Sequence, residues 1–147
     1  MLDEATEVRV IQASPDRCYQ LAADVSSYPD WTTDLKDATV LEADNEGRPF
    51  LVEFRAAAMG RSAAYTLQYD HSEAPGRISW VQTAGDITKR LDGWYTFGAI
   101  PDSPDECEVT YHLEVELLVP LPGFVKRRAE GRIIHTALAD LQARAEG

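Results

Sequence analysis

The C-terminal stretch 109-VTYHLEVELLVPLPGFVKRRAEGRIIHTALADLQARAE-146 changes from one hydrophobic period to another. From Val109 to Leu117 apolar and polar residues alternate, which is the period of two of a half-buried strand. From about Phe124 to Glu146 apolar residues recur every three or four positions, which predicts one long amphipathic helix. The prolines between them end the strand, because proline lacks the N–H donor that a ladder needs. The helix is the only predicted element long enough to cover the inner face of a sheet.

Upstream of this stretch the same strand pattern repeats. In Glu7–Ala13 the valines Val8 and Val10 alternate with Glu7 and Arg9, so we expect a strand whose charges face water. From Leu35 onward, turn signals divide six further strand candidates. The signals are Asp44–Gly47, Met59–Gly60, Glu73–Gly76, Ala84–Asp86 and Pro101–Pro104.

Two short helices are expected after the first strand. Ser14-Pro15-Asp16 is a typical helix start, with a serine cap and a proline in the first turn. The stretch Ser26–Trp31 resembles a tight corner or a second short helix. The sequence therefore predicts an α+β fold, with a seven-stranded curved antiparallel sheet wrapped around a long C-terminal helix, in a single domain of residues 1–147.

Composition excludes several classes of partner. The net charge of −11 would repel a phosphate backbone, so we expect no nucleic acid partner. No apolar run approaches the ~20 residues of a membrane span, and the N-terminus lacks the basic-then-apolar order of a secretion signal. We therefore expect a cytoplasmic protein without integral membrane association. The sequence leaves the oligomeric state unknown.

No cofactor or metal site is predicted from local motifs. Cys18 and Cys107 match no metal or redox spacing, and we expect two reduced thiols, with a structural disulfide as the alternative. His71, His112 and His135 lie outside ligand spacing of one another. The sequence contains no phosphate-binding loop, dinucleotide fingerprint, nucleophile elbow or zinc-protease motif.

One aromatic set is expected to share the inner face of the sheet. Aromatic faces suit a flat or long apolar ligand, and phenol hydroxyls can orient its polar atoms. The alternative is that these side chains simply fill the core. The set consists of Trp31, Tyr65, Tyr69, Trp80, Tyr95, Phe97 and Tyr111. Trp94 has the opposite parity and is expected on the outer face.

Charged residues have two interpretations each. Arg55 with Glu53 could polarise a ligand carbonyl, but Phe50, Val52 and Phe54 compete for the inward face, which favours a solvated pair. Simple alternation turns His112 outward beside Glu114. The basic run Lys126, Arg127 and Arg128, with Arg132 one turn further on, could contact a partner or anionic headgroups, or form a solvated helix face.

The order of elements and five segments resemble the START-like superfamily, and within it the polyketide cyclase/dehydrase family and its coenzyme-Q-binding relatives. The segments are Val10–Pro15, Val25–Trp31, Arg77–Trp80, Gly93–Phe97 and Val109–Tyr111. The resemblance implies a helix-grip fold with a deep cavity for lipids, polyketides or quinones. It does not imply a reaction.

Three functions follow as expectations. The first is binding of a small hydrophobic ligand between the sheet and the C-terminal helix. The second is a polyketide cyclase, aromatase or dehydratase that uses acid and base residues in the same cavity. The third is a protein-interaction module that uses the outer sheet or the basic run.

Overall fold

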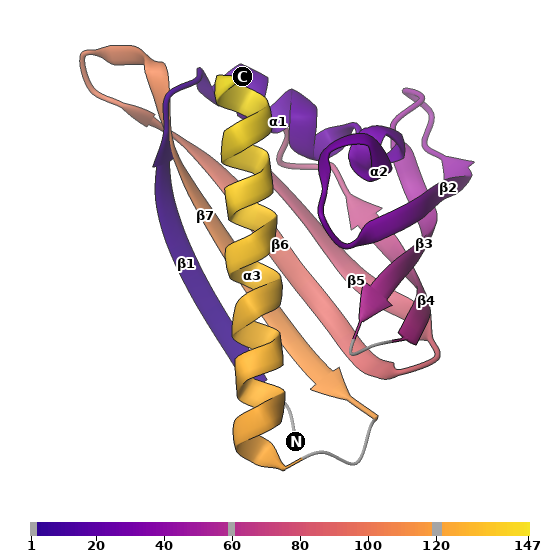
Figure 1. The fold of residues 1–147 in the computed structure, drawn as a ribbon. Coiled ribbons are helices and arrows are strands. Elements are labelled where there is room, and N and C mark those ends of the chain that lie inside the picture. Colours follow the sequence, from indigo (N-terminus) through magenta and orange to yellow (C-terminus); the bar gives the residue numbers. More distant parts are fainter. Residues whose placement is uncertain (1–2, 59–60, 119–121) are drawn as a thin grey trace.

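The computed structural model describes residues 3–58, 61–118 and 122–147 and contains the predicted order of elements (Figure 1). The elements are β1 (Asp3–Ile11), α1 (Pro15–Ala23), the 3₁₀ helix η1 (Val25–Ser27), α2 (Tyr28–Trp31), β2 (Leu35–Ala43), β3 (Pro49–Ala58), β4 (Arg61–Asp70), β5 (Arg77–Gly85), β6 (Thr88–Ile100), β7 (Ser103–Leu117) and α3 (Gly123–Glu146). All seven strands form one antiparallel sheet in the order β1-β7-β6-β5-β4-β3-β2. The predicted fold class is confirmed.

Helix α1 begins where the sequence predicts it. The Oγ of Ser14 accepts a hydrogen bond from the backbone N–H of Arg17 at 3.2 Å, and Pro15 occupies the first turn. Its apolar stripe buries Cys18 and Ala22 against the sheet. The same contact brings Cys18 beside Cys107 of β7, and both are fully buried free thiols. Burial raises the pKa of Cys107 to about 12.

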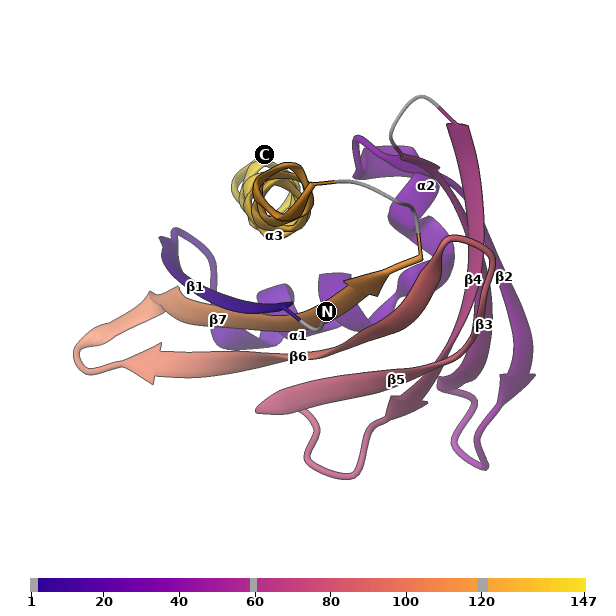
Figure 2. The same ribbon diagram turned by 90° about the horizontal axis from the view of Figure 1, so that it is seen from below.

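The long helix covers only part of the sheet. Seen along its axis, α3 lies over β1 and β7, whereas β2, β3 and β4 curve away toward α2 (Figure 2). Part of the buried core lies under α1 and α3, where Ile134, Leu138 and Leu141 pack on the sheet, and the rest continues along the concave face to Phe54 of β3 and Tyr69 of β4. Because of this curvature, α3 does not cover the concave face of β2, β3 and β4.

Five hydrogen bonds to three residues outside the helix fix the C-terminal half of α3. Asp140 accepts hydrogen bonds from the backbone N–H of Thr33 at 2.7 Å and from its hydroxyl at 2.9 Å. Arg17 donates to the carbonyls of Ala145 and Arg144 at 3.2 and 3.3 Å. Glu146 Oε2 accepts from the N–H of Gln12 at 2.8 Å. These contacts join α3 to α1, to the end of β1 and to the loop before β2.

The expected orientation of β1 was wrong. Val8 and Val10 are 55% and 45% exposed, whereas the charged residues turn toward α3. Arg9 donates to Gln142 Oε1 at 3.0 Å, and Glu7 lies 3.5 Å from the Nδ1 of His135. The reason is that β1 is an edge strand whose inner face meets a polar side of α3. Alternation alone cannot show which face of such a strand is inward.

A glycine marks the point where β5 and β6 separate. Their backbone pairing runs from Arg77 with Thr96 to Trp80 with Gly93 and ends there. A Cβ at position 93 would lie 2.4 Å from the backbone carbonyl oxygen of His112 and 2.9 Å from the indole of Trp80. The close approach of β6 to β7 and to the Trp80 ring at this point therefore requires glycine. Among the described residues, no helix has the length and apolar character needed to cross a membrane.

Candidate ligand-binding cavity

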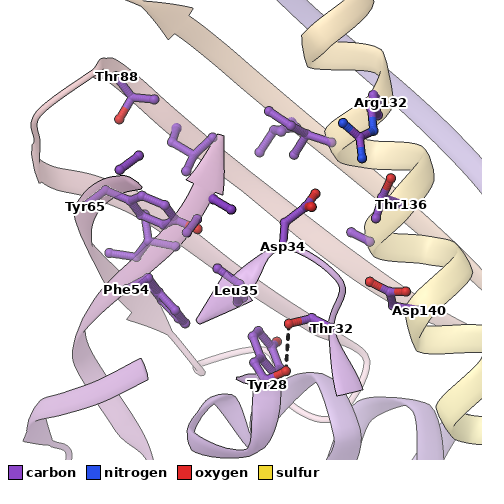
Figure 3. A pocket seen from close by; sticks show the side chains of 18 of the residues that line it. Tyr28, Thr32, Asp34, Leu35, Phe54, Tyr65, Thr88, Arg132, Thr136 and Asp140 are labelled. Atoms are coloured by element: carbon purple, nitrogen blue, oxygen red, sulfur yellow. Dashed lines mark hydrogen bonds between the residues drawn. The ribbon is translucent and has the colours of Figure 1, made fainter. Parts of the chain in front are cut away.

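A cavity of about 240 Å³ lies between α3, α2 and the concave face of the sheet (Figure 3). Its lining combines aromatic, small aliphatic and polar side chains. The aromatic members are Tyr28, Trp31, Phe54, Tyr65, Tyr69, Trp80, Tyr95 and Tyr111. Alanines and larger aliphatic residues fill in between, at Leu35, Ala56, Ala57, Ala63, Leu67, Ile87, Leu91, Leu113, Leu117, Ala129, Ile133 and Ala137. Such a mixture, mostly apolar with a few polar groups, is typical of small-molecule sites.

The structure places six of the seven predicted aromatic residues in this lining. They are Trp31, Tyr65, Tyr69, Trp80, Tyr95 and Tyr111. Phe97 lies on the expected face of β6 but beside the lining, where its ring meets Tyr19 of α1 edge-on at 5.9 Å. Alternation along β6 predicted correctly that Phe97 faces inward, but α1 covers that end of the sheet, so the ring packs on the helix and does not line the cavity. The assignment of the six as ligand-binding residues stays a prediction.

Three of these rings form a rigid wall. Tyr95 and Tyr111 lie across from each other on β6 and β7, with ring centroids 4.4 Å apart. The indole of Trp80 is 5.6 Å from Tyr95 and 5.8 Å from Tyr111, and it meets Tyr111 edge-on at 87°. Each ring holds the others, so the wall presents one fixed aromatic surface.

The tyrosine hydroxyls supply polar groups in an otherwise apolar space. Burial raises the pKa of Tyr65, Tyr69, Tyr95 and Tyr111 well above the ordinary tyrosine value. They therefore stay neutral and can donate or accept a hydrogen bond. Within the described parts of the chain these four hydroxyls make no hydrogen bond, whereas that of Tyr28 donates to the carbonyl of Ala22. The four are free to contact a ligand.

Polar residues from two elements meet at one side of the cavity. Arg132, Thr136 and Asp140 follow one another at four-residue spacing along α3, and Asp34 faces them from the loop before β2 (Figure 3). Asp140 is committed to Thr33. Arg132 is exposed and makes no ion pair with any described residue. Its guanidinium is thus the cationic group that this side can offer to a carbonyl or an anion.

Sequence reasoning missed this polar side. It identified the apolar stripe of α3, which includes Ala129, Ile133 and Ala137, but read Arg132 only as a neighbour of the basic run. A second row one residue before that stripe, at i, i+4 and i+8, was the available signal. No sequence signal placed Asp34, because its position depends on how the loop before β2 meets α3.

The other charged candidates lie away from the cavity. Val52 and Phe54 are buried, so Glu53 and Arg55 face outward, and Arg55 donates to the hydroxyl of Ser62 at 3.2 Å. His112 is on the outer face, stacked on Trp94 as parity predicts. His71 is buried and bonded to the carbonyl of Pro49 at 2.5 Å.

The basic run is also outside the lining. Lys126 donates to the carbonyl of Leu117 at 3.4 Å, while Arg127 and Arg128 are exposed. The structure therefore attaches one of the three to the end of β7. Arg127 and Arg128 remain available at the surface.

Comparison with known proteins agrees with the geometry. Residues 11–142 match the family described as "Polyketide cyclase / dehydrase and lipid transport". A START superfamily protein from Mycobacterium smegmatis has a TM-score of 0.89 at 21% identity, with 97% of each chain covered. An aromatase/cyclase from Streptomyces sp. R1128 gives 0.83 at 15% identity, covering 99% of this chain and 94% of that one.

A more distant likeness extends to a plant protein. The major latex-like protein 151 of Panax ginseng has a TM-score of 0.74 at 13% identity, with 98% of this chain and 97% of that chain covered. At these identities the solved structures show the fold alone. No curated protein matches the sequence at a significant level.

Proposed function

We propose that this chain, which belongs to the polyketide cyclase/dehydrase and lipid transport family, binds a small hydrophobic molecule. The proposed site is the cavity between the sheet and α3. The ligand class is a lipid, a polyketide or a quinone-like molecule. The observation that carries the proposal is an aromatic and aliphatic lining in which four tyrosine hydroxyls have no partner among the described residues.

Apolar burial supplies the affinity in this proposal. A ligand that buries ~300 Å² of apolar surface gains roughly 7 kcal/mol before ordering costs. The hydroxyls and Arg132 then set its orientation, because each can bond an oxygen of the ligand. A molecule with a long or flat apolar body and one or two oxygen-bearing groups fits this arrangement best.

A bulky residue on α3 tests the site. Ala137 lines the cavity, so Ala137→Trp should fill it and weaken binding of the probe 1-anilinonaphthalene-8-sulfonate. Losing even ~60 Å² of apolar contact costs about 1.5 kcal/mol, which is about tenfold in Kd. Fluorescence titration measures the change.

The matched control is Ala143→Trp, which adds the same side chain to an exposed position of the same helix. It should leave the Kd of the probe unchanged. Equal probe affinity in the two variants would contradict the proposed site. Mass spectrometry of small molecules extracted from the natively purified protein would then identify the natural ligand.

A second candidate function is ring closure or dehydration of a poly-keto chain in the same cavity. The observation that favours it is Asp34, whose carboxylate lies close enough to Tyr65 to add to the upward shift of the tyrosine pKa, after burial. Such a pair can move a proton between ligand atoms. Asp34→Asn should abolish turnover of a model poly-keto thioester while leaving probe binding intact; turnover that survives the change would exclude this pair.

A further inference from the structure

The outer face of the sheet, opposite the cavity, holds a histidine between two glutamates. Glu4 pairs with Glu114 across β1 and β7, and the next pair on the same face of the sheet is Thr6 with His112. His112 Nε2 lies 3.6 Å from Glu114 Oε2 and 3.9 Å from Glu4 Oε2. One ligand atom from each of the three residues lies within 4.8 Å of the others. None of these residues belongs to the cavity lining.

Two contacts outside the triad fix the direction of the imidazole. The Nδ1 of His112 is 2.8 Å from the hydroxyl oxygen of Thr6, and the ring stacks on Trp94 with centroids 5.3 Å apart. When Nδ1–H donates to Thr6, Nε2 points a lone pair at two carboxylates. In that tautomer a cation between Nε2 and the two carboxylates is stabilised by all three groups, whereas in the other tautomer Nε2–H faces the carboxylates and the Thr6 hydroxyl donates to Nδ1. A histidine whose second nitrogen is held as in the first of these tautomers is the usual form of a metal ligand.

The surrounding charges leave the required atoms accessible. Arg90 Nη1 lies 3.4 Å from Oε1 of Glu114, so Oε2 remains directed at His112. The Nε of Arg90 also lies 3.6 Å from Oδ2 of Asp92, so the guanidinium interacts with two carboxylates. The carboxylates of Glu4 and Glu114 therefore both face the imidazole of His112, while the guanidinium of Arg90 contacts the other oxygen of Glu114. The guanidinium orients Glu114 but reduces the attraction for a further cation.

We propose that Glu4, His112 and Glu114 bind a divalent transition-metal ion of the Zn²⁺ type, with water completing the coordination. Zinc takes histidine nitrogen and carboxylate oxygen at about 2.0–2.2 Å in tetrahedral geometry, which separates ligand atoms by roughly 3.3–3.5 Å. The two distances from His112 Nε2, 3.6 and 3.9 Å, need only a small closure. The ion would join the edge strand β1 to β7, independently of whether the cavity binds a ligand.

Local sequence spacing predicted no metal site, and the reason is visible in the topology. Glu4 and His112 lie at opposite ends of the chain and meet only because β1 pairs with β7. Strand pairing of this kind creates ligand sets that sequence motifs do not show.

Calorimetric titration of the full chain, freed of metal by a chelator, with ZnCl₂ tests the proposal. The expected result is one ion per chain and a melting temperature that rises with Zn²⁺. Loss of an outer partner alone costs about 10- to 100-fold in metal affinity, so Glu4→Gln should weaken binding by at least about tenfold. His112→Asn should abolish it. Glu4 has a 67% exposed side chain, so its variant keeps the test valid even if His112→Asn fails to fold.

The matched control is His135→Gln, which removes an exposed histidine beside a single carboxylate, Glu7. It should leave Zn²⁺ binding unchanged. A second readout uses Cu²⁺, which should quench the fluorescence of Trp94 through the stacked imidazole, and Trp94→Phe should remove that quenching while Zn²⁺ still binds. Absence of binding up to millimolar Zn²⁺, binding unaffected by Glu4→Gln, or binding lost in His135→Gln would each overturn the proposal.

Discussion

At the scale of single residues, the cavity separates side chains that hold the fold from side chains that are free to contact a ligand. Tyr28 and Tyr95 illustrate the difference. Both line the cavity, but the hydroxyl of Tyr28 donates to the carbonyl of Ala22 and that of Tyr95 has no partner among the described residues. The first hydroxyl therefore contributes to stability, while the second is available to a ligand at the proposed site.

This difference predicts opposite outcomes for one chemical change. Tyr95→Phe should alter the free energy of unfolding by less than ~0.5 kcal/mol, because no hydrogen bond is lost. Tyr28→Phe should cost about 1 kcal/mol, because it leaves the carbonyl of Ala22 without that donor. Chemical denaturation measures both. Equal destabilisation by the two variants would show that the hydroxyl of Tyr95 is also structural.

Residue-level prediction from sequence succeeded where alternation had a single meaning. Tyr65, Tyr69, Trp80, Tyr95 and Tyr111 all turn inward, as their parity on the strands requires. Parity says nothing about position along a strand, so it could not separate Phe97, under α1, from Tyr95, which faces the cavity two residues earlier.

At the scale of elements, α3 is held mainly at its C-terminal half. Glu146 accepts from the N–H of Gln12 and, at 2.9 Å, from the amide of Gln142. These two hydrogen bonds favour the ionised carboxylate and lower the pKa of Glu146. A lowered folded-state pKa means that the contribution to stability is complete above the ordinary glutamate value and is lost as the pH falls through the folded value.

The expected consequence is local. Acidification below the ordinary glutamate range should lower the protection factor of the Gln12 amide, which compares its exchange rate with that of an unstructured amide at the same pH, and Glu146→Gln should lower the protection factor similarly at neutral pH. NMR-detected exchange measures this, with the amides of the β6–β7 pair as the internal reference. An amide of Gln12 that stays protected in both conditions would refute this role of Glu146.

The elements themselves were predictable because each has a local signal. Ser14 and Pro15 start α1, and the change of period after Leu117 starts α3. The orientation of β1 was not predictable, because Glu7 and Arg9 face inward only through His135 and Gln142 on α3. That contact depends on where α3 crosses the sheet, which no local pattern encodes.

At the scale of the whole molecule, the stability of the fold and occupancy of the cavity should be coupled. A ligand that binds only the folded state stabilises it by mass action, by about 2.7 kcal/mol at a concentration 100 times its Kd. Adding back the molecule extracted from the native protein should therefore raise the melting temperature. Ala137→Trp, which fills the cavity, should show no such rise, whereas Ala143→Trp should respond like the unaltered chain.

The arrangement of the whole also explains what sequence reasoning could reach. The inner face and the covering helix follow from hydrophobic periods, and together they imply an aromatic interior. The polar side formed by Asp34, Arg132 and Thr136 and the outer cluster of Glu4, His112 and Glu114 depend on contacts between distant segments. Only the folded chain brings these groups together.

The alanines of the lining have a consequence for how such a protein diversifies. Ala56, Ala63, Ala129 and Ala137 end at their Cβ atoms on three different elements, and each borders the empty space directly. Exchanging any of them for valine or leucine would reduce the volume of the cavity. After gene duplication, a few substitutions at these alanines can thus change which ligand fits the cavity while the fold stays the same.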